Sequence, residues 1–155
     1  MTSADREELS LNDAATHLLE ECRMVLPGMQ ALFGFQLIAV FNTTFDERLS
    51  SGERLIHLTA IVLVTIAIAL VMTPAALHRR TEPHAVSRRF IRISSRLLMA
   101  SMTPLAVGIC LDMYLVSRLI VGTRAVAAAI AASLLAVFIV LWVLLPRVHG
   151  RPDGG

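Results

Sequence analysis

Asp112 is a carboxylic acid inside a long apolar run of the chain, one helical turn after Gly108. A charge at such a position costs about 2–3 kcal/mol on membrane-insertion scales unless it finds a partner, water or a proton. His57 lies at a similar depth near the start of another apolar run. An imidazole beside a carboxyl group can hold and release a proton near neutral pH. Asp112 and His57 are therefore the candidate ion or proton site.

Each of these two residues also has a simpler interpretation. Asp112 could pair with Arg118 or Arg124, a few positions further along the chain, and so fix a turn between two helices. His57 could lie at a membrane–water interface, where its ring is partly hydrated. The sequence leaves these alternatives open.

A stripe of small residues leads to the acid at steps of four, which places its members on one face of a helix. The stripe consists of Ala100, Pro104, Gly108 and Asp112. Small residues let helices approach closely in a bilayer. The expected packing surface is a second small-residue group, formed by Ala125, Ala128, Ala129 and Ala132.

The remaining polar residues in the apolar runs indicate packing rather than catalysis. Gln30 and Gln36 are six positions apart, so they face different directions, and each is expected to bond another helix. Cys22 and Cys110 are far apart, outside any metal-ligand spacing, and are expected to be buried as small apolar residues. No nucleophile–base pair or glycine-rich phosphate loop occurs. We therefore expect no enzyme, no metal site and no cofactor.

The elements that carry these residues are four apolar segments in a chain that is 55% hydrophobic, with a mean hydropathy of +0.68. Segments of this length between charged flanks are typical of transmembrane helices. The predicted fold is all-α, an integral membrane four-helix bundle within a membrane domain over 24–146. The four spans are predicted at about 24–41, 55–77, 97–116 and 125–145. The link Ser117–Arg124 is so short that the last two spans must form an antiparallel hairpin.

The segment 1–23 is acidic and includes the start of an amphipathic helix over 10–26, expected to be cytoplasmic or interfacial. Pro27 is expected to bend the chain where this helix meets the first span. The connector 78–96 is rich in arginine, and it is expected to turn helical after Pro83. The tail 147–155 is predicted to be disordered.

The opposite charges of these two segments suggest that they dock. The residues proposed for this contact are Glu20, Glu21, Arg88, Arg92 and Arg96. Alternatively the arginines bind anionic lipid phosphates. The candidates for lipid binding are Arg79, Arg80, Arg88 and Arg89.

The distribution of arginine predicts the orientation in the membrane. Most arginines fall in the N-terminal segment, the connector and the tail, which lie on one side of the four spans. By the positive-inside rule, both termini are expected to face the cytoplasm. All basic residues are arginine and none is lysine, a bias consistent with a GC-rich bacterial genome, so the expected location is a bacterial inner membrane. The net charge of +2 gives no reason to expect a nucleic-acid partner.

Two short blocks resemble a family of small bacterial four-span membrane proteins whose members form a domain of unknown function. The first block is Glu21-x-Arg23 with Pro27-Gly28-Met29-Gln30, followed by Phe33, Phe35 and Phe41. The second is Pro74-Ala75-Ala76-Leu77-His78-Arg79, where Ala76 replaces the family's usual aromatic residue. The resemblance covers most of 11–120 and implies a four-span helical fold. Some members carry the label sodium:proton antiporter, although this chain lacks the multi-helix repeats typical of antiporters.

Two functions follow from these patterns. The first is an oligomeric ion or proton pathway in which Asp112, with His57, provides the ionisable site. A pathway between copies is expected because four short helices enclose little space of their own, so a homo-oligomer is predicted. The alternative is a non-transporting membrane scaffold or accessory subunit that binds a partner through its acidic helix and arginine-rich connector.

Overall fold

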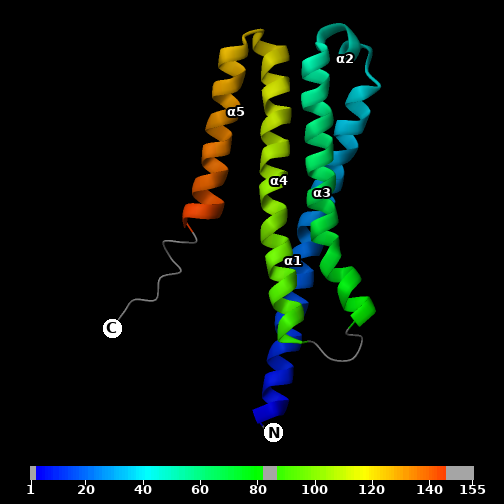
Figure 1. Ribbon diagram of the computed structural model, residues 1–155, viewed down its shortest axis with the longest axis vertical. Helices are drawn as coiled ribbons and strands as arrows, with labels where there is room; N and C mark the ends of the chain where they lie inside the picture. The colour runs from blue at the N-terminus through cyan, green and yellow to red at the C-terminus, as the bar shows by residue number, and fades with distance from the viewer. Residues whose placement is uncertain (1–2, 82–86, 146–155) are drawn as a thin grey trace, which may run out of the picture.

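The structure is a computed structural model that describes residues 3–81 and 87–145. Every regular element in this part of the chain is helical, which confirms the predicted all-α fold (Figure 1). In chain order the elements are α1 (Ser3–Val40), α2 (Thr43–Arg48), α3 (Ser51–Thr81), α4 (Arg88–Val121), α5 (Arg124–Ile139) and the π-helical turn η1 (Val140–Leu144). The predicted tail, most of the link before α4 and the side chains of residues 3–10 lie outside the described residues.

Four helical segments are long and apolar enough to cross a membrane, at Leu11–Val40, Ser51–Arg79, Arg88–Val121 and Arg124–Leu144. Their outer surfaces carry large apolar side chains; Phe35 and Ile38, for example, are 71% and 66% exposed. Such a continuous apolar surface is unfavourable in water and suited to lipid. The chain is therefore a multi-pass membrane protein.

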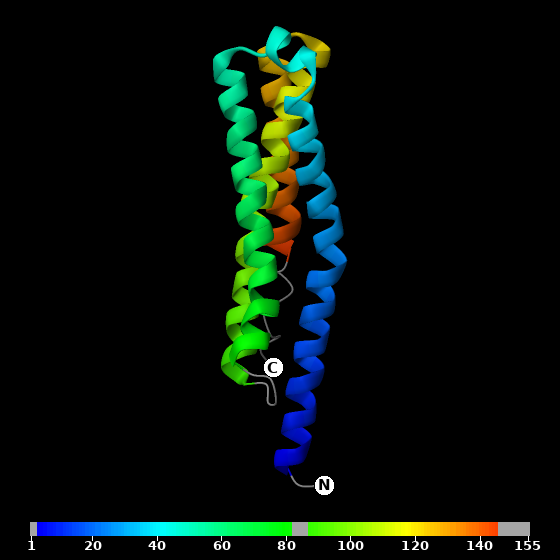
Figure 2. The same ribbon diagram turned by 90° about the vertical axis from the view of Figure 1, so that its right-hand side faces the viewer.

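The amphipathic helix and the first span, expected as two elements, are one continuous helix. α1 runs through Pro27 without a break (Figure 2). A proline removes one backbone hydrogen bond, which neighbouring helices can offset in a membrane protein. Here Met29 and Cys22, on either side of Pro27, are buried in a cluster with Ala67 and Val71 of α3. This packing holds both halves of α1 against α3, although α1 is bowed near its middle (Figure 2).

α3 and α4 approach each other closely at Gly108. Gly108 on α4 lies against α3, where an added methyl group would come within 2.9 Å of Val64 Cγ2 and 3.3 Å of the Ala60 carbonyl oxygen. The small-residue stripe of α4 therefore packs against α3 at Gly108. The prediction that this stripe packs against the last span is wrong. The residues expected to receive it are exposed, namely Ala125, Ala128, Ala129 and Ala132.

α5 packs on the opposite side of α4 from α3 (Figure 1). α4 ends at Val121 and α5 begins at Arg124, so the predicted tight antiparallel hairpin is confirmed. Gly122 makes the turn possible because its φ of 76° is a left-handed conformation that favours glycine. We call the end of the molecule with this turn and α2 the hairpin end. The opposite end, where α1 begins, is the N-terminal end.

Candidate functional site

The structure brings Asp112 and His57 together near the hairpin end. His57 Nδ1 on α3 lies 3.5 Å from Asp112 Oδ1 on α4. A third residue, Gln36 on α1, donates from Nε2 to Asp112 Oδ2 at 2.6 Å. The backbone carbonyl of Gln36 also lies 3.0 Å from His57 Nε2. Three helices therefore meet at one carboxyl group.

The geometry determines where the protons of the His57 ring can be. The Gln36 carbonyl can only accept a hydrogen bond, so His57 Nε2 carries a proton and donates it. His57 Nδ1 then faces Asp112 either as a protonated nitrogen beside a carboxylate or as a lone pair beside a carboxylic acid. The contact thus favours one proton shared between His57 and Asp112.

The site is buried but incompletely satisfied. His57 is 7% exposed and Gln36 is 4% exposed. Gln36 Oε1 and Asp112 Oδ1 are buried without a hydrogen-bond donor among the described residues. The 3.5 Å contact to His57 is an ion-pair distance, longer than a hydrogen bond. The two oxygens are therefore acceptors that a proton or a cation could use.

A cavity of about 260 Å³ adjoins the site and is lined by residues of α1, α2, α3 and α4. Phe45 on the short helix α2 lies over the His57 ring, edge to face, with ring centroids 5.2 Å apart. Both residues line the cavity, as does Asp112. Phe45 therefore covers part of the His57 ring where the cavity reaches Asp112.

The simpler interpretation of Asp112, an ion pair with Arg118, is wrong. Arg118 Nε lies 3.4 Å from Glu53 Oε1 on α3. Glu53 is held for this contact because it caps α3, accepting from the Ser50 backbone N–H at 2.9 Å and from the Ser50 hydroxyl at 2.8 Å. With Arg118 engaged by Glu53, the ionisable side chain observed beside Asp112 is that of His57.

The residues proposed for docking lie at the N-terminal end of the molecule. Glu20 and Glu21 are exposed on α1, and Glu20 lies 3.6 Å from His17 on the same helix. The α4 arginines Arg88, Arg92 and Arg96 are also exposed. The candidate lipid-binding residues Arg79 and Arg89 are exposed as well, whereas the Arg80 side chain lies outside the described residues.

Sequence reasoning missed two parts of this arrangement. It gave Gln36 only a general helix–helix role, and it did not single out Glu53. For Glu53 a signal was present, since Ser50-Ser51-Gly52-Glu53 has the spacing of a capping box. For Gln36 the only signal was that an amide in an apolar run needs a partner on another helix.

The fold and the buried polar cluster define the class of protein, a small helical membrane protein with ionisable groups joined between its spans. The chain belongs to a family of unknown function, DUF6328, whose pattern matches residues 5–146. The match confirms the resemblance to an uncharacterised family. No curated protein and no solved structure matches the chain.

Proposed function

We propose that this protein forms an oligomeric proton pathway in which Asp112 and His57 hold the transferred proton. The observation that supports this most directly is the 3.5 Å contact between His57 Nδ1 and Asp112 Oδ1, with the other ring nitrogen committed to the Gln36 carbonyl. Such a pair exchanges one proton between two groups without breaking its links to α1. Ionisable residues at membrane depth mark ion and proton routes in many membrane proteins.

A route through one copy is obstructed on the N-terminal side of the site. One turn beyond Asp112 in that direction, Gly108 is in close contact with Val64 and Ala60, and both of these α3 residues are 0% exposed. Protons that reach the carboxyl group from the adjoining cavity would therefore meet tightly packed side chains on the N-terminal side of the site. A complete route needs space at a boundary between copies.

The free face of α5 supports assembly into an oligomer. It exposes Ala125, Ala128, Ala129 and Ala132, spaced by three and four along the helix. In a bilayer, stripes of small residues promote close helix–helix contact between chains. Size measurement in nanodiscs tests this step, because Ala128→Phe with Ala132→Phe should shift an oligomer toward monomer. A mass of one copy for the unaltered chain would contradict it.

Proton flux into liposomes tests the proposal as a whole. Purified protein is reconstituted with a pH-sensitive dye inside the vesicles, and a potassium gradient with valinomycin sets the membrane potential. We expect acidification that depends on the protein and is reduced at least tenfold by Asp112→Asn. An asparagine at 112 can still accept from Gln36 and donate to His57 Nδ1, so it removes the shared proton while keeping both contacts.

Glu47→Gln is the matched control, because Glu47 is an exposed acid at the same end of the molecule. This variant should retain the flux of the unaltered chain. Absence of flux under any gradient would overturn the proposal, as would equal flux from the Asp112→Asn protein.

A second candidate function is an accessory subunit that binds a partner at the N-terminal end. It is favoured by the projection of the start of α1 beyond the ends of α3 and α4 (Figure 2), and by Glu20 and Glu21, which are exposed further along the same helix. In this function either these acids dock on the arginines of α4 or they receive a basic surface of the partner. Copurification of the intact chain and of Glu20→Gln with Glu21→Gln compares the bound proteins. An unchanged set of bound proteins would count against this function.

We also propose that both termini face the cytoplasm of a bacterial inner membrane, as the arginine distribution indicates. Single cysteines at Ser3 and at Thr123 test the orientation in a background with Cys22 and Cys110 replaced by alanine. A membrane-impermeant thiol reagent added to intact cells should label position 123 and leave position 3 unlabelled. The reverse pattern would overturn the assignment.

A further inference from the structure

A groove separates α4 from the end of the fourth span. The two helices are in close contact near their turn, where Ala127 is fully buried, and they diverge toward the N-terminal end (Figure 1). The divergence follows from side-chain size, because α5 presents alanine near the turn and the larger Leu135, Phe138 and Trp142 further along. These larger residues hold the helices apart and leave a space of about 420 Å³.

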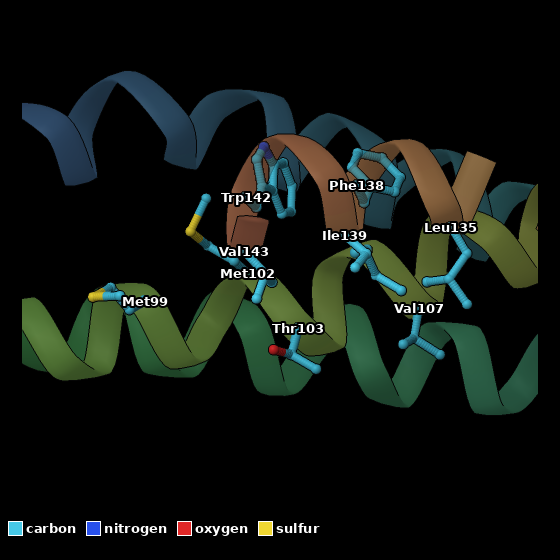
Figure 3. Close-up of a pocket in the computed structure, with 10 residues that line it drawn as sticks. Met99, Met102, Thr103, Val107, Leu135, Phe138, Ile139, Trp142 and Val143 are labelled. Atoms are coloured by element: carbon cyan, nitrogen blue, oxygen red, sulfur yellow. The ribbon is translucent and has the colours of Figure 1, made fainter. Parts of the chain in front are cut away.

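The walls of the groove are almost entirely apolar. Met102, Thr103 and Val107 of α4 face Leu135 and Ile139 of α5 across it (Figure 3). The π-helical turn η1 forms the end of the opposite wall, where the tilted rings of Trp142 and Phe138 have a centroid distance of 4.7 Å. π-Helical turns are rare and occur often at functional sites. Flexible methionines and aromatic rings suit an apolar ligand with a variable shape.

The positions of two arginines suggest the polar part of the ligand. Arg92, Arg96, Met99 and Thr103 are spaced by four, three and four, which places both arginines on the α4 face that carries the groove. The hydrocarbon core of a bilayer is about 30 Å thick and is crossed by about 20 helical residues. We take Arg118 as the edge of the hydrocarbon core at the hairpin end. About 20 residues back along α4, Arg96 then lies just outside the opposite edge of the core, at the level of the lipid phosphates.

Counting about 20 residues along the other wall of the groove reaches a similar depth in the bilayer. α5 begins at Arg124 at the hairpin end, so the opposite edge of the core falls close to Trp142. Tryptophan prefers this interfacial level. The mouth of the groove is thus at the lipid headgroups, and its apolar walls extend toward the bilayer centre.

We propose that the groove between α4 and α5 binds one anionic phospholipid from the surrounding membrane. Its phosphate contacts Arg92 and Arg96, and one acyl chain lies along Met102, Val107 and Leu135. Charge complementarity favours this occupant over α5 of a second copy, the helix proposed for self-association, because α5 and η1 contain no acidic residue that could pair with the two exposed arginines. The site is separate from the His57–Asp112 pair, so it does not depend on proton transfer.

Trp142 is the single tryptophan of the chain and lines the groove, so its fluorescence reports binding. The full chain is reconstituted in phosphatidylcholine vesicles. One sample then receives phosphatidylglycerol with a brominated acyl chain, and the other receives phosphatidylcholine with the same brominated chain. Bromine quenches tryptophan on contact. At equal mole fraction we expect stronger quenching by the brominated phosphatidylglycerol, with a preference of about fivefold per arginine at low salt.

Two variants separate the headgroup contact from the chain contact. Arg92→Gln with Arg96→Gln should bring the ratio of quenching by brominated phosphatidylglycerol to quenching by brominated phosphatidylcholine close to one. Arg48→Gln with Arg124→Gln is the charge-matched control, since both arginines are exposed at the hairpin end, far from the mouth of the groove, and it should keep the preference. Thr103→Phe should fill the groove and reduce quenching by brominated phosphatidylglycerol to the level of phosphatidylcholine. Helix content measured by circular dichroism checks that each variant is folded.

Several results would overturn the proposal. One is equal quenching by the two lipids in the unaltered protein. Another is a preference that survives the loss of Arg92 and Arg96, or that falls equally in the control. Weak quenching by both lipids that rises as the protein is diluted with lipid would show that a second copy covers the groove.

Discussion

The side-chain amide of Gln36 donates a 2.6 Å hydrogen bond to Asp112, joining α1 to α4 across 76 positions of sequence. The same residue holds His57 through its backbone carbonyl. α1 therefore contributes no charge to the site but fixes the orientation of both ionisable groups. A rotation of α1 would separate the carboxyl group and the imidazole from their common anchor.

Gln36→Leu should destabilise the protein, because it leaves the Asp112 carboxyl group without its hydrogen-bond donor. The expected loss is about 1–3 kcal/mol in the free energy of unfolding, measured by denaturant titration in detergent micelles. Gln30→Leu is the matched control on the same helix, since Gln30 is exposed on an apolar surface. It should be neutral or stabilising. Equal losses in the two variants would contradict the structural role of Gln36.

Glu53 and Arg118 should be energetically coupled, because their 3.4 Å ion pair joins α3 to α4 at the hairpin end. A double-mutant cycle with Glu53→Gln and Arg118→Gln should give a coupling energy of about 0.5–1 kcal/mol, as for partly exposed ion pairs. A cycle that combines Arg118→Gln with Asp112→Asn should give a value near zero. The opposite ranking of the two cycles would restore Arg118 as the partner of Asp112.

Ser94 should tolerate the loss of its hydroxyl group. Ser94 is 0% exposed on α4, and its Oγ has no hydrogen-bond partner within the described residues. Ser94→Ala should therefore raise the melting temperature slightly or leave it unchanged, since a buried unpaired hydroxyl is unfavourable. Ser101→Ala should not stabilise, because the Ser101 hydroxyl donates to the Leu98 carbonyl at 2.6 Å. A clear loss of stability in the Ser94 variant would indicate a partner for this hydroxyl.

The hydropathy of the chain was sufficient to predict four spans, because a bilayer requires about 20 apolar residues in each crossing helix. It was also sufficient to place Asp112 and His57 at a similar depth, since depth follows from position along a span. The length of the link between α4 and α5 fixed their antiparallel arrangement. Each of these predictions depends on distance along the helix axis.

The rotation of each helix about its axis was not predictable in the same way. A soluble helix shows its buried face by its apolar stripe, but in lipid both the buried and the exposed faces are apolar. The stripe containing Gly108 could thus face either neighbour, and α3 rather than α5 receives it. The partners of Asp112 and Arg118 depend on these rotations, which explains why the sequence alone left the partner of Asp112 open.

Gly108 offers a direct test of the α3–α4 contact. A methyl group there would lie 2.9 Å from Val64 Cγ2, too close for an ordinary contact, and the Ala60 backbone beside it cannot move without shifting α3. Gly108→Ala should therefore cost about 1–3 kcal/mol of unfolding free energy, and Val64→Ala in the same chain should recover part of that loss. Gly34→Ala on α1 is the control, because nothing lies within 4 Å of the added methyl group. That variant should gain about 0.5–1 kcal/mol from helix propensity. If Gly108→Ala stabilised the protein as much as Gly34→Ala, α4 could not be this close to α3.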